Sequence, residues 1–154
     1  MKNAIMLVLT IVVTAFQLSA QDSTIKASLN NKRFTFAPTT MMPTSGRSRS
    51  VTSSGYLLQV KGNDTLVAYL PYAGRAYSAP MNSSESGINF TSTNFTYAVS
   101  EGKKNSYKVV IVTKDRMYNT TLTLTAYDDG SAYLNVNSSD KQSISYNGSV
   151  TADQ

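Results

Sequence analysis

The sequence predicts an all-β protein, an antiparallel meander of about eight short strands. Every periodic segment beyond residue 20 alternates apolar and polar residues with a period of two, so no helix of ordinary length is expected there. Turn-forming residues recur at intervals of about ten to fifteen residues. Strands with this spacing are typical of a barrel, or alternatively of a β-sandwich, and consecutive hairpins favour an up-and-down order.

The first half of the chain is expected to contain a strand, a polar loop and a hairpin. Residues 32–37 alternate polar and aromatic residues, as a half-buried strand does, and Pro38 is expected to end that strand or to mark a sheet edge. The Ser/Thr-rich residues 44–54 predict a mobile loop. A glycine-containing connection then indicates a hairpin, with strands at 55–60 and 65–70.

The second half is predicted to be a series of hairpins. In residues 117–127 leucine and alanine alternate with threonine, the pattern of a strand with one buried and one solvent-facing side. Residues 107–113 are the most β-prone run. Gly130 suits a tight turn that needs a positive φ. The remaining strands are expected at 88–90, 95–99, 132–136 and 144–146.

Residues 1–20 have the order of a secretory signal peptide. Lys2 gives a positive start, Ala4–Phe16 is apolar, and small residues end at Ala20. The apolar run is too short for a membrane span, which needs about 20 residues. We therefore expect cleavage before Gln21 and no stable membrane span afterwards. The expected organisation is a disordered segment over 21–31, one barrel domain over 32–150 and a tail over 151–154.

Composition excludes several kinds of chemistry. The chain has no cysteine and no histidine, so it offers no Ser-His or Cys-His couple and no soft metal site. Without cysteine it also lacks the anchor of a bacterial lipoprotein, and we expect a soluble periplasmic or secreted protein. Fourteen basic residues outnumber nine acidic ones, but they are scattered and predict no nucleic-acid surface. We expect no enzyme activity, no cofactor and no metal.

One stretch, Leu70–Pro80, interrupts the alternation and has two interpretations. In the structural interpretation, which we favour, Gly74 forms a bulge at positive φ, Tyr72 and Tyr77 close one end of the barrel, and Arg75 bonds carbonyls or an aspartate beneath them. In the functional interpretation, the same arginine and tyrosines line a pocket mouth and clamp an anionic or ring-bearing ligand.

A pair of methionines also has a structural and a functional interpretation. Met41 and Met42 fill gaps in the core or contribute to a ligand surface, and we favour the core.

Several motifs together resemble one known family. These are Met41-Met42-Pro43, Asp64-Thr65, the run Leu70-Pro71-Tyr72-Ala73-Gly74-Arg75-Ala76-Tyr77, and Ile144-Ser145-Tyr146-Asn147-Gly148. They are similar to the exported Bacteroides-type proteins called domain of unknown function 4251, over about residues 34–150. The resemblance implies a lipocalin-like β-barrel and no assigned reaction. In exporters of this type, Asp64-Thr65-Leu66 fits an O-glycosylation motif, which makes Thr65 a candidate glycan site.

The sequence leaves two function classes open. The first is a secreted, non-catalytic barrel that binds a small apolar or aromatic ligand in its interior. The second is an envelope-associated protein-interaction module that uses a strand edge or a tyrosine-rich face. Internal volume separates them, because a filled barrel favours interaction and an open cavity favours a ligand.

Overall fold

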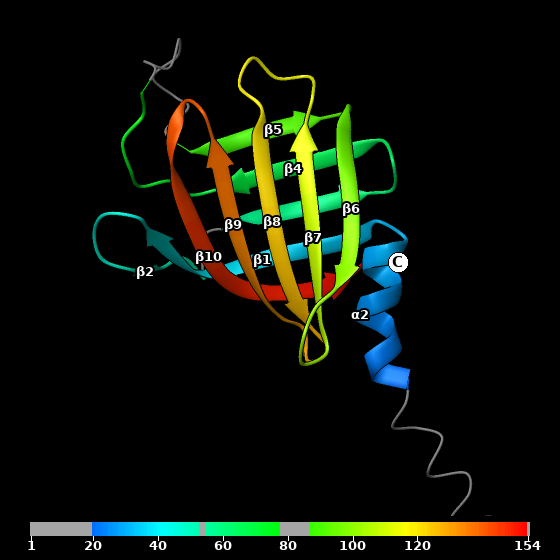
Figure 1. The fold of residues 1–154 in the computed structure, drawn as a ribbon. Helices are drawn as coiled ribbons and strands as arrows, with labels where there is room; N and C mark the ends of the chain where they lie inside the picture. The colour runs from blue at the N-terminus through cyan, green and yellow to red at the C-terminus, as the bar shows by residue number, and fades with distance from the viewer. Residues whose placement is uncertain (1–19, 53–54, 78–86, 154) are drawn as a thin grey trace, which may run out of the picture.

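A computed structural model describes residues 20–52, 55–77 and 87–153 (Figure 1). This part of the chain contains one helix followed by ten strands. The elements are α2 (Ala20–Asn30), β1 (Arg33–Pro43), β2 (Arg49–Ser50), β3 (Leu57–Lys61), β4 (Thr65–Leu70), β5 (Ile88–Ser92), β6 (Phe95–Glu101), β7 (Ser106–Thr113), β8 (Thr120–Tyr127), β9 (Ser131–Ser138) and β10 (Lys141–Ala152).

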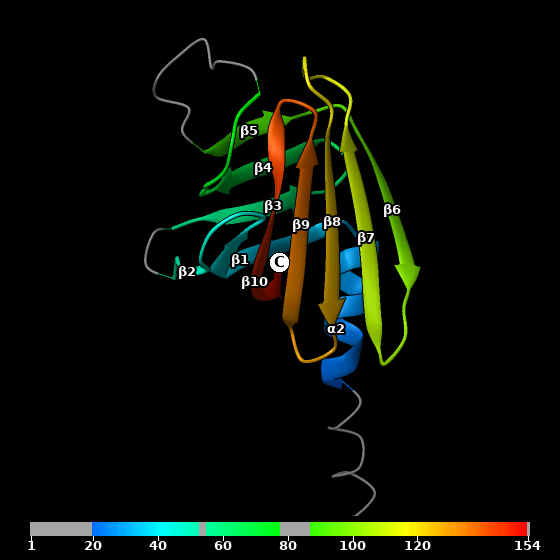
Figure 2. The same ribbon diagram turned by 60° about the vertical axis from the view of Figure 1, so that its left-hand side comes forward.

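The strands form one antiparallel sheet that is nearly closed into a barrel (Figures 1 and 2). Its order is β5-β4-β3-β1-β10-β9-β8-β7-β6, and the short β2 pairs with β1. The first and last long strands therefore pair with each other, and every other strand lies beside its neighbour in the sequence. Of the described strands, β5 and β6 follow one another without pairing, although a short turn joins them, and β2 pairs with β1 but not with β3. The predicted all-β meander is confirmed, with ten strands in place of about eight.

Apolar and polar residues alternate along the strands, and the apolar side chains fill the inside of the barrel. Leucine and alanine of β8 point inward and Thr121, Thr123 and Thr125 point outward, as predicted, and Val109 and Ile111 of β7 are fully buried. The largest fully buried side chains are Tyr146, Phe34 and Phe36, which come from β10 and β1. The first and last long strands, β1 and β10, which pair with each other, thus also supply the bulkiest core residues.

The first strand continues through the proline that was expected to end it. Pro38 lies inside β1, and the pairing of β1 with β10 shifts register between Pro38 and Thr40. Gly148 lies opposite this bulge, where an added Cβ would be 2.2 Å from the carbonyl oxygen of Ala37. A bulge tolerates the missing proline N–H, and the glycine lets the two strands approach closely. The expectation that Pro38 ends the strand was wrong for this reason, although no described strand pairs with β1 at Pro38 on the side of β3.

The segment expected to be disordered forms a helix. Residues 21–31 fall almost wholly within α2, whose Ile25 and Leu29 are four positions apart and buried at 7% and 0% exposure. Lys32 ends the helix in the left-handed region, with a φ of 56°. Only two large apolar residues mark the buried side, so the sequence gives little helical periodicity. The expected disorder, and the absence of a helix, were wrong.

Both chain ends extend beyond the expected domain. At the C-terminal end, Thr151 and Ala152 belong to β10, and the carboxylate of Asp153 accepts hydrogen bonds from Thr35 and Gln59 at 2.9 Å. Residues 151–153 of the predicted tail are therefore part of the fold. At the other end, the predicted signal peptide lies outside the described residues except for Ala20. Among the helices of residues 20–153 that the structure describes, none is long and apolar enough to cross a membrane.

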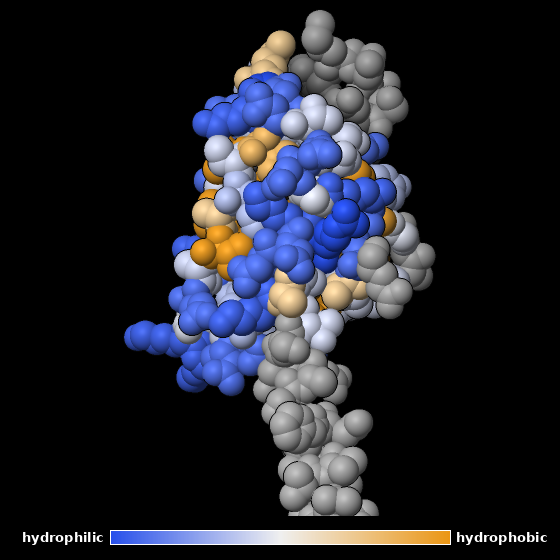
Figure 3. All heavy atoms as spheres, turned by 90° about the vertical axis from the view of Figure 1, so that its right-hand side faces the viewer, coloured by the Kyte–Doolittle hydropathy of each residue, from blue (hydrophilic) through white to orange (hydrophobic). Residues whose placement is uncertain are grey.

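The side of the barrel that carries β6 and α2 is mostly hydrophilic, and hydrophobic side chains show there only in separate small groups (Figure 3). Two contacts hold α2 against β6. The Tyr97 hydroxyl donates to the carbonyl of Leu29 at 2.7 Å, and Lys26 pairs with Glu101. The helix therefore covers one of the two unpaired sheet edges.

Candidate functional site: the mouth of the barrel

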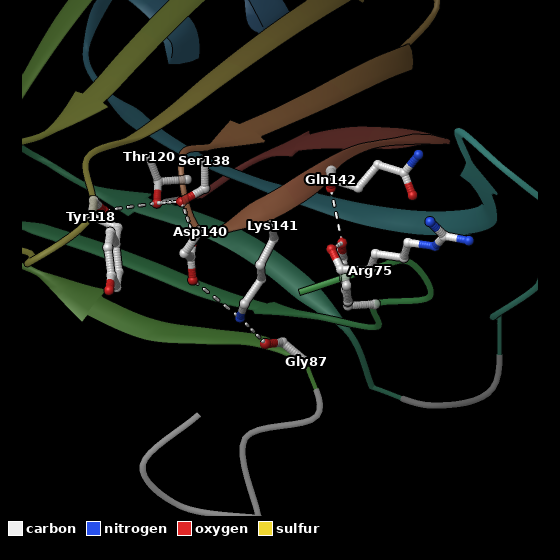
Figure 4. A network of polar contacts seen from close by, with 9 residues as sticks. Arg75, Gly87, Tyr118, Thr120, Ser138, Asp140, Lys141 and Gln142 are labelled. Carbon is white, nitrogen blue, oxygen red and sulfur yellow. Dashed lines mark hydrogen bonds and ion pairs between the residues drawn. The ribbon is translucent and has the colours of Figure 1, made fainter. Parts of the chain in front are cut away.

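The end of the barrel away from α2 has the features of a site, and we call it the mouth (Figures 1 and 4). It is formed by the segment Pro71–Tyr77, which we call the strap, by the start of β5, by the β7–β8 loop and by the β9–β10 turn. These parts surround a pocket that encloses about 30 Å³, which is room for about one water molecule. Tyr72, Phe90, Arg116, Tyr118 and Lys141 are among its lining residues.

The strap lies along the first residues of β10. The Tyr77 N–H donates to the carbonyl of Asp140 at 2.7 Å, and the Gln142 N–H donates to the carbonyl of Arg75 at 2.9 Å. At its other end, the buried Tyr146 donates its hydroxyl proton to the carbonyl of Pro71 at 2.5 Å. Pairing between β1 and β10 stops at Ile144. The strap therefore takes the place of β1 beside the start of β10.

Tyr72 fixes the shape of the strap. Its hydroxyl lies 2.9 Å from the carbonyl oxygen of Arg75 and 3.0 Å from that of Gln142. Burial raises the pKa of Tyr72. An added Cβ on Gly74 would lie 2.6 Å from the Tyr72 hydroxyl oxygen. Gly74 is not among the glycines with positive φ, so the predicted reason for this glycine was wrong, and the need is steric.

The structure separates the other predicted strap residues from the pocket. Arg75 takes part through its carbonyl, while its exposed guanidinium points away from Asp140 and Lys141 (Figure 4). The expected bonding by the Arg75 side chain beneath the strap was therefore wrong. Tyr77 is 68% exposed and is held through its backbone. Of the predicted residues Tyr72, Arg75 and Tyr77, only Tyr72 lines the pocket.

The predicted methionine pair does not line the mouth. Met41 is a core residue with 4% exposure and pairs across the sheet with Tyr146. Met42 lies on the outer side, with its sulfur 3.7 Å from the amide nitrogen of Asn147. The core interpretation is confirmed for Met41. Thr65, the candidate glycan site, is the half-buried first residue of β4 beside the exposed Asp64, and its modification stays a prediction.

Polar contacts join β5 to the opposite rim. The Asp115 carboxylate accepts from the Ser92 hydroxyl at 2.6 Å and from the N–H groups of Thr93 and Asn94 at 2.8 and 3.2 Å. These hydrogen bonds, the one from Ser92 above all, lower the pKa of Asp115. Asp115 thus ties the β7–β8 loop to the turn between the two sheet edges that do not pair.

Two cations complete these bridges. The Lys141 Nζ donates to the carbonyl of Gly87 at 3.2 Å and lies 4.0 Å from Asp140. The Arg116 guanidinium stacks 4.1 Å from the ring centre of Phe90. Asp115, Arg116 and Lys141 were not predicted, because each meets a partner more than 20 positions away in the sequence. The only local signal was that Asp115 and Arg116 lie in the polar connection between β7 and β8.

The polar side chains of the mouth therefore mainly hold its segments together, and we call this set of contacts the polar clasp. Asp115, Asp140, Arg116 and Lys141 already contact backbone groups, hydroxyls, a ring or each other. Among the residues that the structure describes, no group of three or more histidine, cysteine or acidic residues is placed to hold a metal ion. The large hydrophobic side chains exposed around the rim are Tyr77, Met117 and Tyr118.

Fold and mouth together define a small, nearly closed β-barrel filled by its own side chains. A family model described as "Domain of unknown function (DUF4251)" matches residues 17–150, and the chain belongs to this family. The chain is similar to a DUF4251 family protein from Bacteroides eggerthii DSM 20697, whose crystal structure has a TM-score of 0.63. The two are 15% identical, over 86% of this chain and 87% of that chain, a likeness that concerns the fold alone. No curated protein matches the chain.

Proposed function

We propose that this protein is an exported, non-catalytic interaction module that contacts a partner protein of the cell envelope at its mouth. The supporting observation is the filled interior. Aromatic and aliphatic side chains of both halves of the sheet occupy the barrel, and the pocket at the mouth encloses about 30 Å³. Pockets for small molecules usually enclose several hundred Å³. A small apolar or aromatic ligand inside the barrel therefore has less support than a partner outside it.

The rim offers the side chains that protein interfaces favour. Met117 is 85% exposed, Tyr77 68% and Tyr118 37%, and Arg116 and Tyr118 both line the pocket. Tyrosine, methionine and arginine are enriched in interfaces, and tyrosine and arginine often dominate the binding energy. The mouth combines these residues with a polar clasp that holds them in place.

Site-specific photo-crosslinking in the cells that produce the protein tests this proposal. A benzophenone amino acid replaces Met117 at the mouth or, as the matched control, Tyr127, an exposed residue at the opposite end of β8. We expect a discrete crosslinked protein from position 117 and none from position 127. No crosslink at 117, or equal crosslinks at both, would contradict the proposal. Native mass spectrometry that finds a small molecule bound stoichiometrically would favour the ligand carrier.

A further inference from the structure

The outer face of β8, β9 and β10 presents an ordered array of hydroxyl and amide groups. The array lies on the outer wall of the barrel and does not depend on the proposed function of the mouth. We call it the hydroxyl–amide face and define it by Thr121, Thr123, Thr125, Tyr133, Asn135 and Ser145.

Strand register places these residues in rows across the sheet. Thr123 pairs with Asn135, which pairs with Ser145, and Thr125 pairs with Tyr133. Neighbouring strands are about 4.8 Å apart, so each row presents polar groups at a short, regular spacing. The three strands lie side by side in both ribbon views (Figures 1 and 2).

The face carries no charge. The outward residues of β8, of β9 and of β10 from Ser143 to Thr151, all within the described part, are threonine, serine, asparagine or tyrosine. A soluble protein surface is commonly designed with charged residues at about a quarter to a third of positions. The nearest charged residues lie around the face, at Asp128, Asp129 and Asp140 in the turns, at Lys141 at the start of β10, and at Lys108 of β7, which pairs with Thr125.

Part of the face is already ordered by its own hydrogen bonds. The Tyr133 hydroxyl donates to the Ser145 hydroxyl oxygen at 2.7 Å, and the Asn135 amide donates to the same oxygen at 3.0 Å. The amide also reaches the Ser143 hydroxyl oxygen at 3.3 Å. Tyr133 keeps 40% of its surface exposed. A ring and an amide held in this way lose little side-chain entropy when a ligand binds.

We propose that the hydroxyl–amide face binds a neutral polysaccharide chain. Sugar hydroxyls both donate and accept hydrogen bonds, as do threonine, serine and asparagine side chains, and the apolar side of a sugar ring can stack on Tyr133. A neutral face meets a neutral ligand without the cost of desolvating a charge. A polyanion would require cations and a stable protein partner would require an apolar centre, and these residues supply neither.

Affinity electrophoresis tests the proposal with soluble starch, xyloglucan, laminarin and galactomannan, each cast into native gels. We expect at least one of them to slow the wild-type protein, and Tyr133→Ala to weaken that interaction roughly tenfold. Tyr69→Ala is the matched control, because Tyr69 is 44% exposed on the outer side of β4. That variant should migrate like the wild type in every gel.

A second variant separates binding from folding. Asn135→Asp keeps the shape of the side chain but places a charge in the middle of the face, and it should also abolish the retardation while the melting temperature stays near that of the wild type. The proposal is overturned if none of the four polysaccharides slows the wild type, if dextran sulfate alone does so, or if a polysaccharide retards wild type, Tyr133→Ala and Asn135→Asp equally. These outcomes leave the crosslinking test of the mouth unaffected.

Discussion

The two ends of the barrel are closed by different forces. At the helix end, α2 inserts Ile25 and Leu29 into the core, and both side chains are buried. At the mouth, the strap, the β7–β8 loop and the β9–β10 turn meet through hydrogen bonds and charged side chains around a pocket of about 30 Å³. One end is closed by apolar burial and the other by polar contacts.

This difference has energetic consequences. Burial of a leucine or isoleucine contributes about 1.5–3 kcal/mol and is indifferent to pH and salt. A hydrogen bond contributes about 0.5–1.5 kcal/mol net, and exposed charge pairs weaken as salt is added. We therefore expect the mouth to open more readily than the helix end, as a surface that must adapt to a partner would.

The largest expected effect is at the helix end. Leu29→Ala should lower the free energy of unfolding by about 2–5 kcal/mol, because it removes a fully buried side chain that has little room to be replaced. Urea unfolding measures the loss. Met117→Ala at the mouth is the comparison, since its exposed side chain should change stability by less than about 0.5 kcal/mol. A loss below about 1 kcal/mol for Leu29→Ala would mean that α2 is not docked.

Alkaline pH should weaken both ends. Burial raises the pKa of Tyr97 at the helix end and of Tyr146 near the mouth above that of an unfolded tyrosine. Their neutral forms therefore stabilise the fold below pH about 10, and that stability is lost as the pH rises further, by up to about 1.4 kcal/mol per pH unit for each tyrosine.

Urea unfolding between pH 8 and pH 11 measures this dependence. Tyr97→Phe and Tyr146→Phe should each reduce its slope. A stability that stays constant up to pH 11 would contradict the assignment.

Within the mouth, Gly74 and Tyr72 should act as a unit. Gly74→Ala displaces the Tyr72 hydroxyl, and Tyr72→Phe removes it, so each should cost about 1 kcal/mol. Because both changes break the same contacts, the double variant should cost less than the sum of the two. Additive losses in urea unfolding would show that Gly74 serves another purpose.

The smallest effect is expected from acid. Hydrogen bonds to Asp115 lower its pKa, so its stabilising contribution is present above pH about 4 and is lost as the pH falls through the lowered value. Asp115 is exposed, and the loss should stay below about 1 kcal/mol. Asp115→Asn should flatten the pH dependence of unfolding between pH 5 and pH 2. If the loss of stability between pH 5 and pH 2 is the same in Asp115→Asn as in the wild type, Asp115 is not the source of that loss.

The sequence by itself determined the barrel wall. A period of two places leucine, valine and isoleucine on one side of each strand, and that alternation is local information. It was sufficient for β7, β8 and β9, for the hairpin of β3 and β4, and for the up-and-down order. The hydroxyl–amide face is the other half of the same alternation.

Only the tertiary structure decided how the ends are closed. The helix has two large buried side chains, which are too few to predict a helix from the sequence. They stabilise the helix only because it packs on the core of the barrel. The glycine in the strap is required by a tyrosine hydroxyl, and Arg75 bonds through its carbonyl, which any residue carries. Asp115, Arg116 and Lys141 meet partners that are distant in the sequence. Local periodicity specifies strands, whereas contacts between distant segments depend on where the closed sheet brings them together.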